Sequence, residues 1–249
     1  MSTAIVTGAS SGLGSELAKR LNDRGHQVVL VARSASALES LASELNGALV
    51  VPADLATQEG RDAVVAACPS PDIVVNNAGF GGFGPFAESD PAMVQSMISV
   101  NCSALTALTQ AYLPKMVAAG KGRILNIAST ASFQPGPLLA VYCATKAYVL
   151  SFTEAVAEEN RGSGVSITAF CPGAFASGFQ EAAHAEKSRL VNGRKLPTSA
   201  DIADEAMRAL DGSQVVYVPG LFNKIGAQAT RFVPRGVTRR MVSYIQAEK

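Results

Sequence analysis

The chain has 249 residues, of which 48% are hydrophobic and 16% are charged, and its formal net charge is +1. This composition is typical of a globular protein with a large core and excludes an intrinsically disordered chain. The small net charge gives no overall field that selects nucleic acid or an anionic membrane, and no apolar run is long enough to span a bilayer.

The cysteine and histidine content bears on metal binding and on the cellular compartment. The chain has four cysteines and two histidines, and no two cysteines form a CxxC pair. This pattern argues against a structural zinc site, so we expect no metal. The N-terminal "MSTAIVTGAS" lacks the basic region and cleavage site of a signal peptide. Free thiols without such a signal predict a reducing, cytoplasmic location.

Seven short apolar runs alternate with longer segments of helical periodicity. The runs are apolar at consecutive positions, as expected for strands buried on both faces. They cover residues 4–8, 27–33, 48–54, 72–79, 123–129, 165–173 and 215–220. The alternation predicts an α/β fold, a single domain of residues 1–249 with a doubly wound parallel sheet of about seven strands and helices on both faces. The stretch 175–197 has no clear apolar run, and we expect a substrate lid there; a plain surface excursion is the alternative.

The first predicted strand leads into a glycine-rich loop. Gly8, Gly12 and Gly14 have GxxxGxG spacing between a strand and a helix. Glycines allow a tight turn and close backbone approach to a pyrophosphate, and the helix N-terminus offers free N–H groups. The loop therefore predicts a dinucleotide site, with a purely structural turn as the alternative.

The second predicted strand ends in "LVARSAS", which bears on the choice of cofactor. An NAD site requires Asp or Glu at about Ala32 to bind the ribose hydroxyls, and Arg33 follows that position instead. A guanidinium forms charge-assisted bonds to a 2′-phosphate, and Ser34 adds a further donor. The strand end predicts NADP(H), unless Arg33 is only a surface residue.

Tyr142 and Lys146 lie four residues apart, so a helix places them on one face. A cation within about 6 Å lowers the pKa of a phenol from its ordinary value of about 10, whereas burial raises it. The pair predicts proton transfer at Tyr142 with Lys146 as the tuning cation; ordinary helix composition is the alternative. Ser129 ends the fifth predicted strand, where open α/β sheets bind ligands, and would stabilise charge on a substrate oxygen.

Together these motifs resemble the short-chain dehydrogenase/reductase family, and the resemblance covers almost the whole chain. It rests on TGxxxGxG at the first loop, on "NNAG" at 76–79, on "PG" at 172–173, and on the order of Asn101, Ser129, Tyr142 and Lys146. Apolar segments such as "GPFAESD" and "SFQPGP" suggest a bacterial subgroup of ketone and aldehyde reductases. The resemblance implies a Rossmann-type fold and an enzyme whose catalytic residues are Asn101, Ser129, Tyr142 and Lys146.

The same resemblance implies roles for individual residues at the cofactor. Asn101 would hold a water that links Lys146 to solvent, unless the asparagine is a structural plug, and Lys146 would hold the nicotinamide ribose. Ser11 replaces a basic residue of the family, so the preference for NADP(H) is expected to be moderate. The expected cofactor-binding residues are Gly8, Ser10, Ser11, Gly12, Leu13, Gly14, Arg33, Ser34, Asp54, Leu55, Asn77, Ala78, Gly79, Tyr142, Lys146, Pro172, Gly173 and Ser177.

The candidate pocket walls at 80–86 and 133–139, together with the lid, are mostly apolar. They predict an enzyme of the carbonyl reductase or alcohol dehydrogenase type, which reversibly reduces a neutral ketone or aldehyde. The alternatives are a 3-oxoacyl-thioester reductase and a non-catalytic NADP(H)-binding redox sensor.

The expected partners are a small carbonyl or alcohol substrate and, by resemblance, further copies of the chain in a homodimer or homotetramer. We expect no nucleic acid and no membrane span. The arginine-rich segment 229–246 could meet an acyl-carrier protein, a phosphate-bearing acyl group or a membrane surface, but a solvated helix face is favoured there.

Overall fold

The computed structural model describes residues 2–176 and 196–246. Seven parallel strands form one sheet in the order β3-β2-β1-β4-β5-β6-β7. The strands are β1 Thr3–Thr7, β2 Gln27–Ala32, β3 Leu49–Pro52, β4 Ile73–Asn76, β5 Gly122–Ile127, β6 Val165–Phe170 and β7 Val216–Tyr217. The chain winds outward from β1 to β3, then returns to β4 beside β1. This order is the predicted doubly wound, Rossmann-type sheet, with its switch point between β1 and β4.

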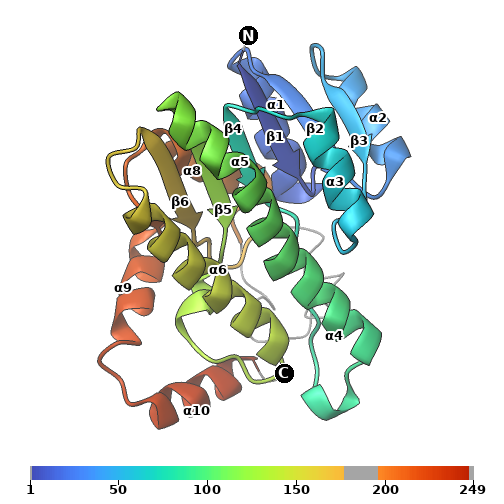
Figure 1. Cartoon of the computed structure of the whole chain (residues 1–249). Helices are drawn as coiled ribbons and strands as arrows, with labels where there is room; N and C mark the ends of the chain where they lie inside the picture. The colour runs from blue at the N-terminus through green and yellow to red at the C-terminus, as the bar shows by residue number, and fades with distance from the viewer. Residues whose placement is uncertain (1, 177–195, 247–249) are drawn as a thin grey trace.

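Helices cover both faces of the sheet, as predicted (Figure 1). The helices are α1 Gly12–Asp23, α2 Ala35–Ser43, α3 Gln58–Ala67, α4 Pro91–Ile98, α5 Leu105–Ala119, α6 Ala140–Glu159, α8 Ser199–Asp211, α9 Leu221–Ala229 and α10 Arg235–Gln246. Within β1, Val6 packs in the core shared with α1, α2 and α8, while Ile5 packs in the core shared with α3 and α5. Both faces are buried, which explains why the strands read as continuous apolar runs.

Several strands end earlier than their apolar runs. The run 72–79 forms a strand only over Ile73–Asn76, because the N–H groups of Asn77 and Ala78 bond to the side chain of Thr7 instead of a backbone carbonyl of β1. Residues beyond the strand ends form loops at the carboxyl edge of the sheet. A parallel sheet binds ligands at this edge.

The long helical segment after β4 is not continuous. A π-helical stretch, Ser99–Ala104, separates α4 from α5 and contains Asn101. A π-helical turn carries one more residue than an α-helical turn and often marks a functional site. The extra residue turns Asn101 toward the loop after β4, where its side-chain amide bonds both backbone groups of Phe80.

The last two helices lie at the carboxyl edge of the sheet (Figure 1). Thr238, Val242 and Gln246 form the buried side of α10. A Cβ placed on Gly136 would lie 2.1 Å from Cys143 Sγ and 3.3 Å from Gln246 Nε2, so the end of α10 meets the loop before Tyr142. None of the described helices is both long and apolar enough to cross a membrane.

Candidate active site

The glycine loop forms a narrow cradle between β1 and α1. Gly8 and Gly12 have φ of +66° and +58°, a conformation that L side chains rarely adopt. A Cβ on Gly14 would lie 2.1 Å from the carbonyl oxygen of Gly8, so only glycine lets the first turn of α1 approach the loop. Leu13 is buried, whereas Ser10 and Ser11 border the loop, and Ser11 is exposed. The N–H groups of the first helical turn face the same edge, which suits a phosphate group.

A buried threonine connects this loop to the end of β4. Thr7 Oγ1 accepts from the backbone N–H groups of Asn77 and Ala78 at 3.0 and 2.9 Å. The Asn77 side chain donates to the Thr7 and Gly8 carbonyls at 2.9 and 3.3 Å. Sequence reasoning missed Thr7, although its place as the last residue of β1 could have indicated a role. The contacts hold two strand ends together at the switch point.

The residues after β2 and β3 lie at the same edge. Arg33 is exposed, and its side chain has no hydrogen bond or ion pair with the part of the chain that the structure describes. Ser34 caps α2 by accepting from Ala37 N at 3.4 Å. Asp54 is also exposed and accepts from Ala56 N at 2.9 Å, whereas Leu55 is buried. Arg33 therefore leaves a cation available at the end of β2, whereas the Ser34 hydroxyl already has partners in α2.

Asn101 is 1% exposed and has protein partners for its whole side-chain amide. Its Nδ2 donates to Phe80 O at 2.9 Å and to Thr145 Oγ1 at 3.0 Å, and its Oδ1 accepts from Phe80 N at 3.1 Å. Thr145 is the neighbour of Lys146 on α6. The amide therefore links the loop after β4 to the helix that carries Lys146, and it does so through direct contacts.

Ser129 follows β5 and begins a short 3₁₀ helix, Thr130–Phe133. Its Oγ accepts from Ala131 N at 3.1 Å and donates weakly to Pro172 O at 3.5 Å. Ser132 has a structural position, because its buried hydroxyl donates to Lys146 O at 2.8 Å and accepts from Ser129 N at 3.3 Å. The structure thus separates two nearby serines, and Ser129 is the one next to Tyr142.

Burial dominates the acidity of Tyr142. It raises the pKa of the phenol from 10.0 to about 12, and a hydrogen bond with the Ser129 side chain acts in the opposite direction. Lys146 Nζ lies 5.9 Å from the centre of the phenol ring. Of the two opposing effects expected at this phenol, burial is the larger one in the protein without cofactor. Tyr142 therefore keeps its proton at neutral pH.

Lys146 is 6% exposed, and burial lowers the pKa of its ammonium from 10.5 to about 8. Its Nζ donates to the Ile127 carbonyl at 2.7 Å. A Cβ on Gly79 would lie 3.5 Å from Nζ and 3.0 Å from Asn101 Oδ1. A side chain at this position would crowd Asn101, so Gly79 brings the loop after β4 close to both side chains.

Two apolar loops border the group formed by Ser129, Tyr142 and Lys146. The loop 80–86 and the loop 133–139 contain no charged residue. They are joined where Gly84 N donates to Leu138 O at 2.8 Å. Leu138 has a φ of +67°, which is uncommon for a residue other than glycine and is found at functional sites more than elsewhere.

The segment after β6 contributes Pro172 and Gly173. Thr130 N donates to Pro172 O at 2.9 Å, which places the loop after β6 beside the loop after β5. A Cβ on Gly173 would lie 2.8 Å from Asn223 Nδ2 of α9. Ser177 and most of the expected lid lie outside the described residues. At the edges of that stretch, Ala176 N donates to Pro197 O at 2.8 Å.

Other polar and sulfur-containing side chains do not join the group. Tyr148 is 42% exposed and bonds Thr106 Oγ1 at 2.8 Å, so it points to another face of α6 than Tyr142. Burial raises the pKa of the Cys143 thiol to about 11 and of the Cys171 thiol to about 12, which makes both poor nucleophiles. Residues 2–176 and 196–246 contain no cluster of side chains that could hold a metal ion.

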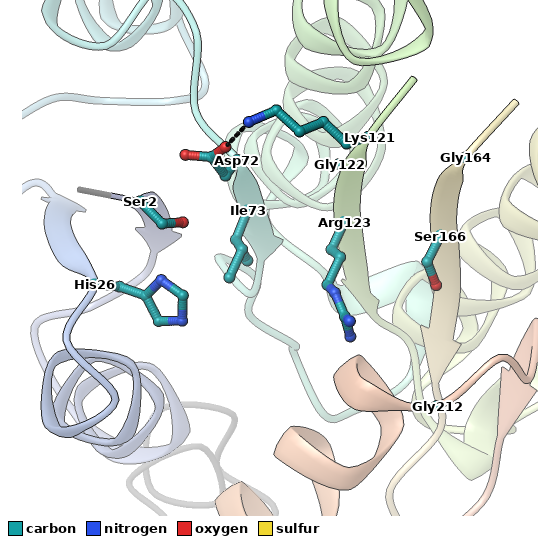
Figure 2. Close-up of a pocket in the computed structure, with 10 residues that line it drawn as sticks. All are labelled: Ser2, His26, Asp72, Ile73, Lys121, Gly122, Arg123, Gly164, Ser166 and Gly212. Atoms are coloured by element: carbon teal, nitrogen blue, oxygen red, sulfur yellow. Dashed lines mark hydrogen bonds and ion pairs between the residues drawn. The ribbon is translucent and has the colours of Figure 1, made fainter. Parts of the chain in front are cut away.

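A depression of about 370 Å³ lies at the opposite, amino edge of the sheet (Figure 2). Lys121 Nζ bonds Asp72 there at 3.3 Å, and Arg123 bonds the Leu210 carbonyl, so both cations have protein partners. Its lining comes from the starts of strands, including Ile73 and Ser166. Parallel sheets bind ligands at the other edge, so the candidate active site is the group around Tyr142.

A model of the short chain dehydrogenase family matches residues 2–188. The chain belongs to the short-chain dehydrogenase family. The expected membership is therefore confirmed, and the chain is an oxidoreductase of that family.

Three similar proteins have names that indicate a cofactor or a substrate. The chain is 36% identical to a ketoacyl reductase from Nostoc over 69% of its own length and 62% of that relative. It is 31% identical to a short-chain dehydrogenase from Sphingobium yanoikuyae solved in complex with NADPH, with a TM-score of 0.84 and 95% of each chain covered. It is 30% identical to a bulky-bulky ketone specific alcohol dehydrogenase from Comamonas testosteroni, with a TM-score of 0.79 and 93% of each chain covered.

The residues present fit a nicotinamide dinucleotide, the cofactor of this family. A Cβ on Gly8 or Gly14 would fill the cradle, and Gly12 keeps a positive φ there. The end of β2 offers Arg33 to a phosphate, and Gly79 leaves open the approach to Lys146. The groups that could bind the cofactor therefore lie along the carboxyl edge of the sheet, from the end of β2 across the switch point to the end of β5.

Proposed function

We propose that this short-chain dehydrogenase is an NADP(H)-dependent enzyme that reduces a neutral, mostly apolar ketone or aldehyde to the alcohol, reversibly. In this proposal residues 1–249 act as one cofactor-binding and catalytic unit. The main support is the grouping of Ser129, Tyr142 and Lys146 beside Gly79, at the edge where the glycine cradle opens.

The cofactor would lie along the carboxyl edge of the sheet. The loop 8–14 would hold the pyrophosphate, Arg33 and Ser34 the 2′-phosphate, and Asp54 with Leu55 the adenine. Asn77 to Gly79, Tyr142, Lys146 and the loop starting at Pro172 would border the nicotinamide half. When bound, NADPH supplies the hydride for the reduction.

Tyr142 would donate its hydroxyl proton to the carbonyl oxygen of the substrate. Its raised pKa supports this role, because the phenol carries its proton at neutral pH. Ser129, hydrogen-bonded to Tyr142, would donate a second hydrogen bond to the same oxygen and stabilise its developing charge.

Lys146 would act beside them as an ammonium below about pH 8, where its charge favours the loss of the proton from Tyr142. Asn101 would hold the loop after β4 against α6. The expected water at Asn101 stays a prediction.

The substrate class rests on the two uncharged loops. Loops 80–86 and 133–139 offer no charged partner to a carboxylate substrate, which favours a neutral carbonyl compound. The Comamonas relative, an alcohol dehydrogenase for bulky ketones, supports the same class. The Nostoc ketoacyl reductase supports a second candidate, the reduction of a 3-oxoacyl thioester. A non-catalytic redox sensor would not need the Ser129–Tyr142–Lys146 group.

The test is the oxidation of NADPH and of NADH with a panel of aliphatic, aromatic and steroid ketones, aldehydes and acetoacetyl thioesters. We expect turnover with NADPH, and Tyr142→Phe should lose about 100-fold or more because the proton donor is removed. The fold and the affinity for NADPH should survive this change. Tyr148→Phe removes the same hydroxyl from the other face of α6 and should keep most activity.

Near-normal turnover in Tyr142→Phe would contradict the role of Tyr142. Preferred turnover of acetoacetyl thioesters would favour the second candidate. NADPH binding without turnover on the whole panel would favour the sensor.

A further inference from the structure

Helix α9 presents its apolar side to solvent. Leu221, Phe222 and Ile225 lie on one face and are exposed, and Phe222 reaches 92%. Ala227, on the opposite face, is the buried residue of this helix. A surface helix of a globular protein normally has the reverse arrangement, with its apolar face toward the core.

The exposed apolar surface continues into α10. Phe232, in the connection between the helices, is 85% exposed, and Tyr244 of α10 is 70% exposed. Val237 and Met241 are exposed on the same side of α10 as Tyr244, at spacings of four and three residues. Single exposed apolar residues are ordinary, but a run of aromatic and aliphatic side chains over two helices marks an interaction surface.

The same segment carries a concentrated positive charge. Residues 221–246 contain five basic side chains and no acidic one: Lys224, Arg231, Arg235, Arg239 and Arg240. The rest of the chain is therefore net acidic, at −4. All five are exposed, and none forms an ion pair within the described residues. The field from this segment is strongly positive although the net charge of the chain is +1.

We propose that α9 and α10 dock on the surface of an anionic lipid bilayer. Phe222 and Phe232 would enter the boundary between headgroups and acyl chains, while the five cations bind the lipid phosphates. A second copy of the chain is disfavoured, because a two-fold interface would bring like-charged segments together. An acidic protein would satisfy the charge, but exposed aromatic side chains together with cations and no acidic residue are the pattern of helices that lie in a membrane interface.

Docking would bring the candidate active site to the membrane. The end of α10 contacts the loop before Tyr142, and Asn223 of α9 lies against Gly173. An apolar carbonyl compound dissolved in the bilayer would then reach the site without crossing water. This last step rests on the proposed function, whereas the docking and its test do not.

The test is co-sedimentation of the full-length protein with vesicles. We expect the bound fraction to be about tenfold higher on phosphatidylglycerol mixed with phosphatidylcholine than on phosphatidylcholine alone, and to fall as salt is added. Replacing both Phe222→Ser and Phe232→Ser, or both Arg239→Glu and Arg240→Glu, should lower binding to the anionic vesicles about tenfold. Circular dichroism and NADPH affinity check that these variants fold.

Matched controls lie at the amino edge of the sheet. Leu49→Ser removes an exposed apolar side chain, and Arg161→Glu reverses an exposed charge, and both should bind vesicles as the wild type does. Equal binding to both kinds of vesicle, or equal losses in the controls, would overturn the proposal. So would binding to an acidic carrier protein without binding to vesicles. If the protein does not bind vesicles but forms a dimer, and the double variant Phe222→Ser with Phe232→Ser dissociates that dimer, the surface belongs to a second copy of the chain.

Discussion

Arg33 is the side chain on which the proposed preference for NADP(H) rests. It follows the second strand and is exposed, and it has no ion-pair partner among residues 2–176 and 196–246. Binding a 2′-phosphate would therefore break no existing ion pair within those residues. An acidic side chain at this position would instead repel the phosphate and accept hydrogen bonds from the ribose of NADH.

We expect Arg33→Asp to lower the ratio of kcat/KM for NADPH to that for NADH by about tenfold or more, because a charge-assisted bond is lost and a repulsion is added. The measurement is steady-state kinetics with both cofactors and one carbonyl substrate. Arg161→Asp, an exposed arginine at the other end of the sheet, should leave the ratio unchanged. An unchanged ratio in Arg33→Asp would exclude Arg33 from cofactor discrimination.

At the scale of elements, position 14 in the first turn of α1 requires glycine for space and not for conformation. Gly14 has an ordinary helical φ, yet its missing Cβ would lie 2.1 Å from the Gly8 carbonyl oxygen. The loop and the helix can adopt the cradle shape only while this position has no side chain. A larger residue must move backbone, which is more costly than turning a flexible side chain.

Gly14→Ala should reduce the free energy of unfolding by about 1–3 kcal/mol and weaken NADPH binding, because α1 moves away from the loop. Urea unfolding and fluorescence titration with NADPH measure the two effects. Gly226→Ala in α9 is the matched control, since no heavy atom lies within 4 Å of its Cβ position. It should be neutral or stabilise by up to about 1 kcal/mol. Equal stability of the two variants would contradict the steric argument.

The π-helical stretch between α4 and α5 shows where reading elements from a sequence reaches its limit. The residues from 90 to 120 carry one continuous helical pattern, and the insertion at Ser99–Ala104 leaves no local signal in it. The insertion is favoured by contacts with distant residues: Asn101 bonds Phe80 on one side and Thr145 on the other. Periodicity reports only which face of a helix is buried.

At the scale of the whole molecule, a buried lysine makes stability depend on pH. Burial lowers the pKa of Lys146 from 10.5 to about 8. Between these values the unfolded chain binds more protons than the folded one, so the free energy of unfolding rises with pH. The raised pKa of Tyr142 has the opposite effect, but only above its ordinary value of 10.0. The Lys146 contribution is therefore clearest on the alkaline side of neutrality.

From about pH 7 to about pH 9 the stability of the wild type relative to Lys146→Met should increase by about 1 kcal/mol. Urea unfolding of both proteins across this range measures the difference, in which the titration of other groups cancels. Lys115→Met removes an exposed lysine from α5, and its free energy of unfolding should change with pH as that of the wild type does. A constant difference between wild type and Lys146→Met would mean that Lys146 is not desolvated in the folded protein.

The sequence by itself determined the sheet, the glycine loop and the spacing of Tyr142 and Lys146. These features follow from local patterns: apolar runs for strands buried on both faces, glycines at a strand–helix junction, and an i, i+4 pair on one helix. The tertiary structure decided what depends on residues far apart in the chain. It set the direction of the Tyr142 pKa, gave Asn101 its two partners, and left the apolar side of α9 facing solvent with Phe222 exposed. Desolvation and packing arise only when distant segments meet, so no local pattern can specify them.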